Sequence, residues 1–243
     1  MLAETRARTK LKSEELATLP DAPYSQTLDR GLRVLELLAA AEGPLSIADL
    51  SREIDVHRSI IYRMVRTLEA HRLVARGPDG RYELGLGMAA LARSVRPVLQ
   101  SAALPTLSDL ADDVGLTAFL VVPDGDEAVT LISVEPQRTQ VHVTYRPGVR
   151  HPIHRGAPGI ALLAGRPPTP GEPENVIEAR ARGWAFSHSE VIPGMRSVAA
   201  PVTDQRGQVH ASVAVIYVAE ELSRETLAER VIKAATAIAN RLP

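Results

Sequence analysis

The chain of 243 residues contains no cysteine, and that absence excludes several kinds of site. Disulfide bonds, iron–sulfur clusters and thiolate zinc sites all need cysteine sulfur, so this protein uses none of them. Aromatic residues are also scarce, at 3%, so the core must be built mainly from aliphatic side chains. A chain of this length accommodates one large domain or two ordinary ones.

Long apolar runs are missing as well. None approaches the roughly 18 residues that a membrane-spanning helix requires. The N-terminal stretch MLAETRARTKLKSEEL is charged and lacks the apolar region of a secretory signal peptide. We therefore expect a cytoplasmic protein with no membrane partner.

The net charge of −1 argues against a uniformly basic nucleic-acid binder, but the charge is unevenly distributed. Between Asp55 and Arg81 the chain has six arginines and three acidic residues, a local balance of +3. A basic segment in a neutral chain is typical of a DNA-binding module joined to a different domain. Ordinary solvated surfaces also show such imbalances, so the interpretation depends on the pattern around these arginines.

Two helices are predicted ahead of the basic segment. Leucines recur near the 3.6-residue period from Thr27 until the Gly43–Pro44 pair stops the run. Ser46 then begins a short helix, with Asp49 in the acidic position of a capping box. Residues 1–24 alternate in charge sign and are expected to form a flexible arm.

The segment Ile54–Leu73 predicts a third helix with two different faces. Its apolar stripe has the spacing i, i+3, i+4 and i+7 of one helix face: Ile61, Met64, Val65 and Leu68. Away from this stripe lie basic and polar side chains: Arg58, Ser59, Tyr62, Arg63 and Arg66. Asp55 occupies the tight link before this helix, where a positive φ is often needed and Asp tolerates it.

A β-hairpin is predicted directly after the third helix. Two short strands, about 73–76 and 81–84, flank a Gly-Pro-Asp-Gly turn. Three helices followed by a hairpin make a winged helix-turn-helix, here residues 25–85, in which the third helix can enter the major groove.

The second half of the chain changes character. Residues 86–100 are predicted to form a helical linker, with a helix break at Pro97. From Gly115 onward, β-branched runs alternate with turn signals: LTAFLVVP, EAVTLISVE, VHVTY, MRSVAAPVT and VHASVAVIYV. Two short helices, about 157–164 and 174–182, and a long C-terminal amphipathic helix accompany these runs. We therefore predict an α+β fold with an antiparallel sheet.

The chain resembles the IclR-type bacterial transcriptional regulators over nearly its whole length. Four segments carry the resemblance: VHRSIIYRMVRTLE, DGRYELG, GVRHPIHRGAPGIALLA and EARARGWAFSHSEVIPGMRSVAAPVTDQRGQVHASVAV. It implies a GAF-like antiparallel-sheet sensor domain over residues 101–243 that binds an effector and oligomerises. It also implies a homodimer or tetramer on double-stranded operator DNA. The chain lacks a Gly-x-Ser-x-Gly motif, a phosphate-binding glycine loop and a metal triad. We therefore expect that the protein is not an enzyme and binds no cofactor.

The candidate DNA-binding residues lie on the third helix and in the wing: Arg58, Ser59, Ile60, Tyr62, Arg63, Arg66 and Arg81. An arginine can pair bidentately with guanine or clamp a phosphate, and Ser59 can donate to a phosphate at the helix N-terminus. Ile60 stands where the family usually has threonine, and it could contact a thymine methyl group. The alternative is that these arginines are merely solvated.

The candidate effector-binding residues follow from the resemblance: Gly156, Ala157, Ser187, Ser197, Ala214 and Ile216. Backbone N–H groups at the first two positions suit a ligand oxygen. Because two of the other four are aliphatic and Ser187 is not an acid, we expect an effector more apolar than a short keto acid. The alternative for each residue is ordinary core packing.

Two further alternatives concern the histidines and the second domain. His151 and His154 have a spacing that a metal could use, but Pro152 and the lack of a nearby acid argue against a metal site. His154 is instead expected to fix the loop before the sensor pocket, and His57 to be an exposed neutral side chain. The second domain could also serve only to oligomerise, without binding an effector.

Overall fold

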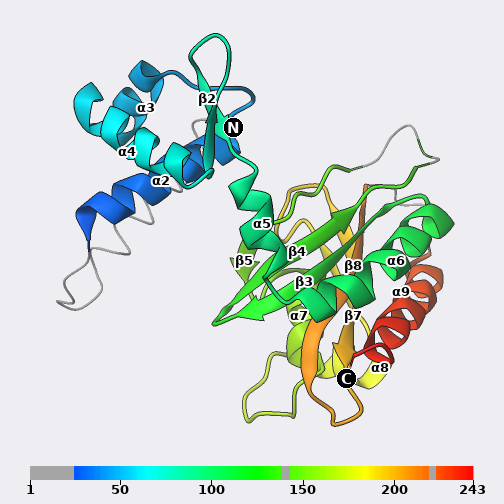
Figure 1. Ribbon diagram of the computed structural model, residues 1–243. Helices are drawn as coiled ribbons and strands as arrows, with labels where there is room; N and C mark the ends of the chain where they lie inside the picture. The colour runs from blue at the N-terminus through cyan, green and yellow to red at the C-terminus, as the bar shows by residue number, and fades with distance from the viewer. Residues whose placement is uncertain (1–24, 138, 140–142, 219–222, 243) are drawn as a thin grey trace. The chain divides into compact units, whose positions relative to one another are not determined.

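The computed structural model describes residues 25–137, 139, 143–218 and 223–242 (Figure 1). The chain divides into two compact units, Met1–Val95 and Arg96–Pro243. The predicted arm, residues 1–24, lies outside the described residues, and so does His142 of the predicted strand VHVTY.

The N-terminal unit has the element order of a winged helix-turn-helix, as predicted. Its elements in chain order are α2 (Gln26–Ala40), α3 (Ile47–Ile54), α4 (Arg58–Ala70), β1 (Val74–Arg76), β2 (Tyr82–Leu84) and α5 (Gly87–Arg93). One aliphatic core joins the helices to the wing and includes Val34, Leu50, Ile61, Val65 and Val74. The wing also pairs with the segment before α3 through a β-bridge between Leu45 and Tyr82.

Local sequence signals set the turn between α3 and α4. Ser46 and Asp49 form a complete capping box at the start of α3, as the sequence predicts. Asp55 ends α3 in the left-handed conformation, with φ at 59°. Since few residues other than Gly, Asn and Asp adopt this conformation cheaply, Asp55 fixes the direction in which α4 leaves the turn.

The C-terminal unit is a six-stranded antiparallel sheet with helices on both faces. Its elements in chain order are α6 (Pro97–Val114), β3 (Thr117–Asp124), β4 (Glu127–Val134), β5 (Arg150–Pro152), α7 (Gly156–Ala164), α8 (Glu174–Arg182), β6 (Ala185–His188), β7 (Arg196–Thr203), β8 (Val209–Tyr217) and α9 (Arg224–Ala239). The strand order is β5-β4-β3-β8-β7-β6, and every pairing is antiparallel. The α+β prediction is confirmed.

Each face of this sheet has its own apolar core, because successive side chains of a strand point to opposite faces. Leu120 of β3 packs in the core that α6 and α9 cover. Its neighbour Phe119 packs in the core that α7 and α8 cover. The central strands are therefore buried on both sides, which explains why their sequences are nearly continuous apolar runs rather than alternating ones.

Three strands differ from the sequence prediction. Residues 143–145, part of the predicted strand VHVTY, are not in a strand. The edge strands β5 and β6 are not predicted, because they are only three and four residues long and, unlike the equally short wing strands, they do not flank a hairpin turn signal. β5 contains Pro152, which an edge strand tolerates since one side of it makes no ladder hydrogen bonds.

The predicted linker, residues 86–100, contains α5 and the first turn of α6. The break before Pro97 occurs where Arg96 adopts a left-handed conformation. Arg96 donates a hydrogen bond to the His210 carbonyl, and Leu99 is buried in the C-terminal core. The C-terminal unit therefore begins at the start of α6. None of the described helices is both long and apolar enough to cross a membrane.

Candidate nucleic-acid interface and ligand cavity

Helix α4 presents a row of exposed side chains that its own domain does not use. Arg58, Tyr62, Arg63 and Arg66 are exposed, whereas Ile61, Met64 and Val65 are buried in the domain core. No hydrogen bond or ion pair joins the three guanidinium groups to other described residues. A helix held by one face, with free guanidinium groups on another, has the chemistry needed to contact phosphates and base edges.

The N-terminus of α4 has a cap that the sequence analysis missed. His57 is exposed, as predicted, but its Nδ1 accepts a hydrogen bond from the Ser59 backbone N–H at 3.3 Å. The same Nδ1 lies 2.8 Å from the Ser59 hydroxyl. His57 therefore acts as the N-cap residue, in the extended backbone conformation that such residues adopt. It holds Ser59 at the start of the helix, where free N–H groups favour an anion.

Ile60 lies apart from the exposed row. It is half-buried and packs against the domain core. It also lines a groove between α4 and α2, next to the exposed Leu28 and Leu32. Its side chain thus lies on the side of α4 next to α2, in a groove that Arg63 also lines, and its contact with a thymine methyl group stays a prediction.

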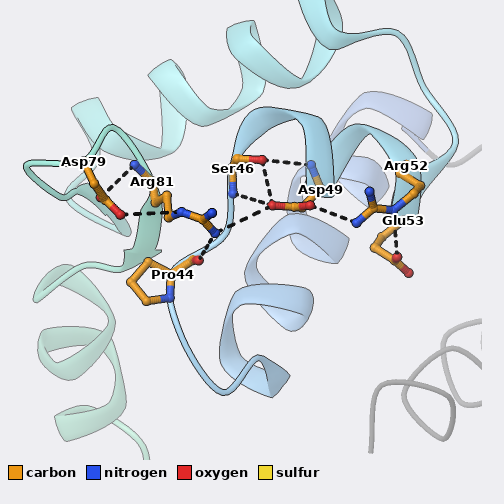
Figure 2. A network of polar contacts seen from close by, with 7 residues as sticks. All are labelled: Pro44, Ser46, Asp49, Arg52, Glu53, Asp79 and Arg81. Atoms are coloured by element: carbon orange, nitrogen blue, oxygen red, sulfur yellow. Dashed lines mark hydrogen bonds and ion pairs between the residues drawn. The ribbon is translucent and has the colours of Figure 1, made fainter.

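Arg81 differs from the α4 arginines because its guanidinium has partners within the domain (Figure 2). Its Nη1 donates to the Pro44 carbonyl at 3.3 Å and lies 4.0 Å from Asp49 Oδ2. Its Nε lies 3.5 Å from Asp79 Oδ2 in the wing turn. The side chain thereby ties the wing to the start of α3, while about half of it, 51%, stays exposed.

Asp49, at the centre of this network, gives the domain a predicted acid dependence. Hydrogen bonds from the Ser46 hydroxyl and backbone N–H, and from Arg52, lower the pKa of Asp49 from 3.8 to about 2. A carboxyl whose pKa is lowered by folding stabilises the fold above its unfolded pKa, and that contribution is lost as the pH falls through the folded pKa. We expect Asp49→Ala to lower the free energy of unfolding by about 1 kcal/mol near neutral pH.

The difference in free energy of unfolding between wild type and Asp49→Ala should shrink as the pH falls from about 4 toward 2. Urea denaturation followed by circular dichroism measures this free energy at each pH. Glu42→Ala is the matched control, because Glu42 is exposed in the turn before α3 and has no partner among the described residues. A difference from wild type that stays constant down to pH 2 would contradict this role of Asp49.

The C-terminal unit encloses a small cavity between its sheet and the N-terminus of α7. The cavity measures about 30 Å³ and is lined by Phe119, Tyr145, His151, Gly156, Pro158, Ser187, Glu190, Val191, Ile192, Met195, Ser197 and Ile216. Of the six predicted effector residues, four line it. Ala157 and Ala214 do not, and both are fully buried in the adjoining core.

The two backbone N–H groups expected to face an effector already have partners. The Gly156 N–H donates to the Glu190 carboxylate at 2.7 Å, and the Ala157 N–H donates to the Ser187 hydroxyl at 2.8 Å. Gly156 has a φ of +76°, and a Cβ there would lie 2.7 Å from Val191, so only glycine fits this turn. The Ser197 hydroxyl donates to the Val215 carbonyl at 2.9 Å.

His151 is the most deeply buried ionisable side chain of the cavity lining, with 5% of its surface exposed. Burial lowers the pKa of His151, so its ring is neutral near pH 7. Nδ1 lies 3.1 Å from the Pro152 carbonyl, which can only accept, so Nδ1 carries the proton. Nε2 is then an acceptor, and it is buried without a hydrogen-bond partner among the described residues.

Glu190 and His151 are the functional side chains that the prediction missed at this site. Glu190 stands three residues after Ser187, within one of the four segments that carry the family resemblance. The sequence suggests for His151 only the spacing of a metal ligand. In the described part of the chain, no group of three or more His, Asp or Glu side chains is placed to hold a metal ion.

Comparison with known proteins agrees with this architecture. The IclR helix-turn-helix domain model matches residues 27–78, and the bacterial transcriptional regulator IclR C-terminal model matches residues 93–178 and 172–241. The chain belongs to the IclR family. It is accordingly a transcriptional regulator with an N-terminal DNA-binding domain.

Similar IclR-type regulators are found in several bacteria. The transcriptional regulator BhcR of Paracoccus denitrificans is 30% identical over 80% of this chain and 78% of its own length. The glycerol operon regulatory protein of Streptomyces griseus is 31% identical over 81% of this chain and 86% of its own length.

Solved structures share the fold. An IclR homologue from Microbacterium hydrocarbonoxydans, solved in complex with 4-hydroxybenzoate, has a TM-score of 0.75 at 22% identity. The match covers 89% of this chain and 98% of that one. IclR from Thermotoga maritima has a TM-score of 0.73 at 23% identity, over 90% of this chain and 99% of its own.

Proposed function

We propose that this IclR-family protein is a cytoplasmic, ligand-responsive regulator whose α4 helix enters the major groove of a pseudo-palindromic operator. The observation that carries this proposal is the exposed row Arg58, Tyr62, Arg63 and Arg66, which has no partner among the described residues. Ser59 adds a phosphate donor at the helix N-terminus. Arg81 contributes by holding the wing, with its exposed edge turned to the DNA backbone. Ile60 supports α4 from the side of α2.

The C-terminal unit provides the sensor in this proposal, and it joins the chains into a homodimer or tetramer. Gly156, Ser187, Ser197 and Ile216 line the effector cavity, with Ala157 and Ala214 supporting it from the core. The effector is a small organic molecule more apolar than a short keto acid, because the lining is mostly apolar. Its binding changes DNA affinity only if it favours one arrangement of the protein over another.

No catalytic role is proposed, and no cofactor. The relatives named above are transcriptional regulators. A second candidate is a regulator whose C-terminal unit only oligomerises. The cavity favours a sensor, since it combines apolar walls with a few convergent polar groups, as ligand sites do.

Operator binding should depend steeply on salt. Each phosphate that the protein neutralises contributes about 0.9 to the slope of log affinity against log salt concentration. We expect binding to the region upstream of the protein's own gene, measured by fluorescence anisotropy between 50 and 300 mM salt, to show this steep dependence. An affinity independent of salt would contradict the assignment of α4 to DNA.

The sensor role has a separate test. A true effector should stabilise the protein by about 2.7 kcal/mol at a hundredfold excess over its Kd, visible as a thermal shift. It should also change operator affinity in the anisotropy assay. If a broad panel of small molecules changes neither the melting temperature nor the operator affinity, the oligomerisation-only alternative stands.

A further inference from the structure

The anion-binding position of the cavity is already filled by the protein itself. The first N–H groups of a helix attract anions, and at α7 the Gly156 N–H is bonded to the Glu190 carboxylate. The loop that carries Glu190 is held in place by two further contacts. The Arg155 guanidinium donates to the Glu190 carbonyl, and the Ser189 N–H donates to the Met195 carbonyl at 2.8 Å.

A second, independent feature is the unpaired acceptor on His151. Nε2 of this ring is buried and has no hydrogen-bond partner in the described chain, and His151 is one of the residues that line the cavity. The ring carbon beside it, Cε1, comes within 3.5 Å of the position that a Cβ on Gly156 would take. A buried acceptor without a donor is unfavourable, and a ligand with an N–H or O–H group would remove that cost.

The charge of the cavity lining also disfavours an anionic ligand. Glu190 is the one ionised side chain among the twelve lining residues, and no lysine or arginine is among them. A ligand carboxylate would therefore meet a carboxylate already present, and the nearby Arg155 guanidinium is already bonded to the Glu190 carbonyl. Like charges in one poorly solvated site oppose each other, and an unpaired buried charge is expensive.

We infer that this cavity selects uncharged or cationic organic molecules that donate hydrogen bonds, and that Glu190 excludes carboxylates from it. The inference rests on the proposed role of the cavity as the effector site. A donor of the ligand pairs with Glu190 and with His151 Nε2. Phe119 and Tyr145, whose ring centroids lie 4.6 Å apart, provide an apolar wall for the body of the ligand.

The size of the cavity adds a requirement. About 30 Å³ is room for roughly two water molecules, since one needs about 10–15 Å³. An aromatic ligand therefore requires the lining side chains to move apart, while Glu190 and His151 stay within reach of it.

The test compares three probes that share one ring: 4-hydroxybenzoate, 4-hydroxybenzamide and 4-hydroxybenzylamine. Their affinities for the full-length protein are measured by calorimetry at pH 7.5. We expect the neutral amide and the cationic amine to bind at least tenfold more tightly than the carboxylate. Glu190→Gln keeps an oxygen for the Gly156 N–H but removes the charge. It should weaken the amine and strengthen the carboxylate, each by about tenfold.

Glu178→Gln is the matched control, because Glu178 is exposed on α8 of the same unit. It should leave all three affinities unchanged, and the melting temperatures of both variants show that the fold is intact. Three results overturn the inference: tightest binding of the carboxylate by wild type, an order that Glu190→Gln does not change, or no binding of any probe at millimolar concentration. The proposed sensor function is judged separately, by the broad panel and the operator assay.

Discussion

Arg63→Ala is expected to weaken specific operator binding by about 10- to 100-fold, with no loss of stability. A single arginine contact to a base or phosphate is worth about 1–3 kcal/mol. Arg63 is exposed on α4 and has no partner among the described residues, so its removal leaves the domain core untouched. Fluorescence anisotropy measures the affinity, and thermal denaturation monitors the fold.

The type of contact can be separated in the same experiment. If Arg63 contacts a phosphate, the variant should lose about one unit from the salt slope and weaken binding to all sequences alike. If it contacts a base, the loss should be confined to the operator. Arg206→Ala, at an exposed turn of the C-terminal unit, is the matched control and should bind DNA like wild type. Unchanged operator affinity in Arg63→Ala would remove this residue from the proposed interface.

Gly85→Ala is expected to destabilise the N-terminal unit by about 1–3 kcal/mol, the usual cost of forcing extra atoms into a packed site. Gly85 follows the wing, and a Cβ there would lie 2.3 Å from the Arg72 carbonyl oxygen and 3.0 Å from the Val74 carbonyl carbon. Both neighbours are backbone atoms, so neither can rotate away. The Gly85 N–H also bonds to the Leu73 carbonyl at 2.8 Å, which ties the end of the wing to the chain leaving α4.

The expected readout is a melting temperature lower by several degrees, with roughly 4–8 °C per kcal/mol for a domain of this size. Operator affinity should fall as well, because the wing and the end of α4 shift together. Gly43→Ala is the control, since a Cβ at Gly43 meets nothing within 4 Å and its φ is not positive. A Gly85→Ala protein as stable as Gly43→Ala would show that this close approach relaxes without cost.

Much of the N-terminal unit follows from neighbouring residues alone. The Ser46–Asp49 capping box, the left-handed Asp55 and the apolar spacing of α4 are each encoded within a few positions, and the structure confirms all three. The long buried strands of the C-terminal unit were predictable for a similar reason. A strand buried on both faces needs a nearly continuous apolar run, and the sequence contains such runs.

Elements that depend on distant partners were less predictable. β5 and β6 are too short to have a periodic pattern, and they exist because β4 and β7 provide hydrogen-bonding edges. The residues of the cavity come from five strands, one helix and two loops, so most of them have no signature in the linear sequence. The resemblance to relatives located four of them, but it does not reveal which of their N–H and hydroxyl groups already have hydrogen-bond partners within the protein.

The sequence by itself determined the family, the order of the domains, and the apolar and basic faces of α4. Periodicity and motif order are local properties of the chain, so they can be recognised without the structure. Only the tertiary structure decided what three individual side chains do. Ile60 packs against the domain core and lines the groove next to α2. Arg81 donates a hydrogen bond to the Pro44 carbonyl and lies beside Asp79 of the wing. The Glu190 carboxylate accepts a hydrogen bond from the Gly156 N–H, the first of α7. The physical reason is that a side chain's freedom to bind something else depends on its neighbours in space, and those are set by packing between segments far apart in the chain.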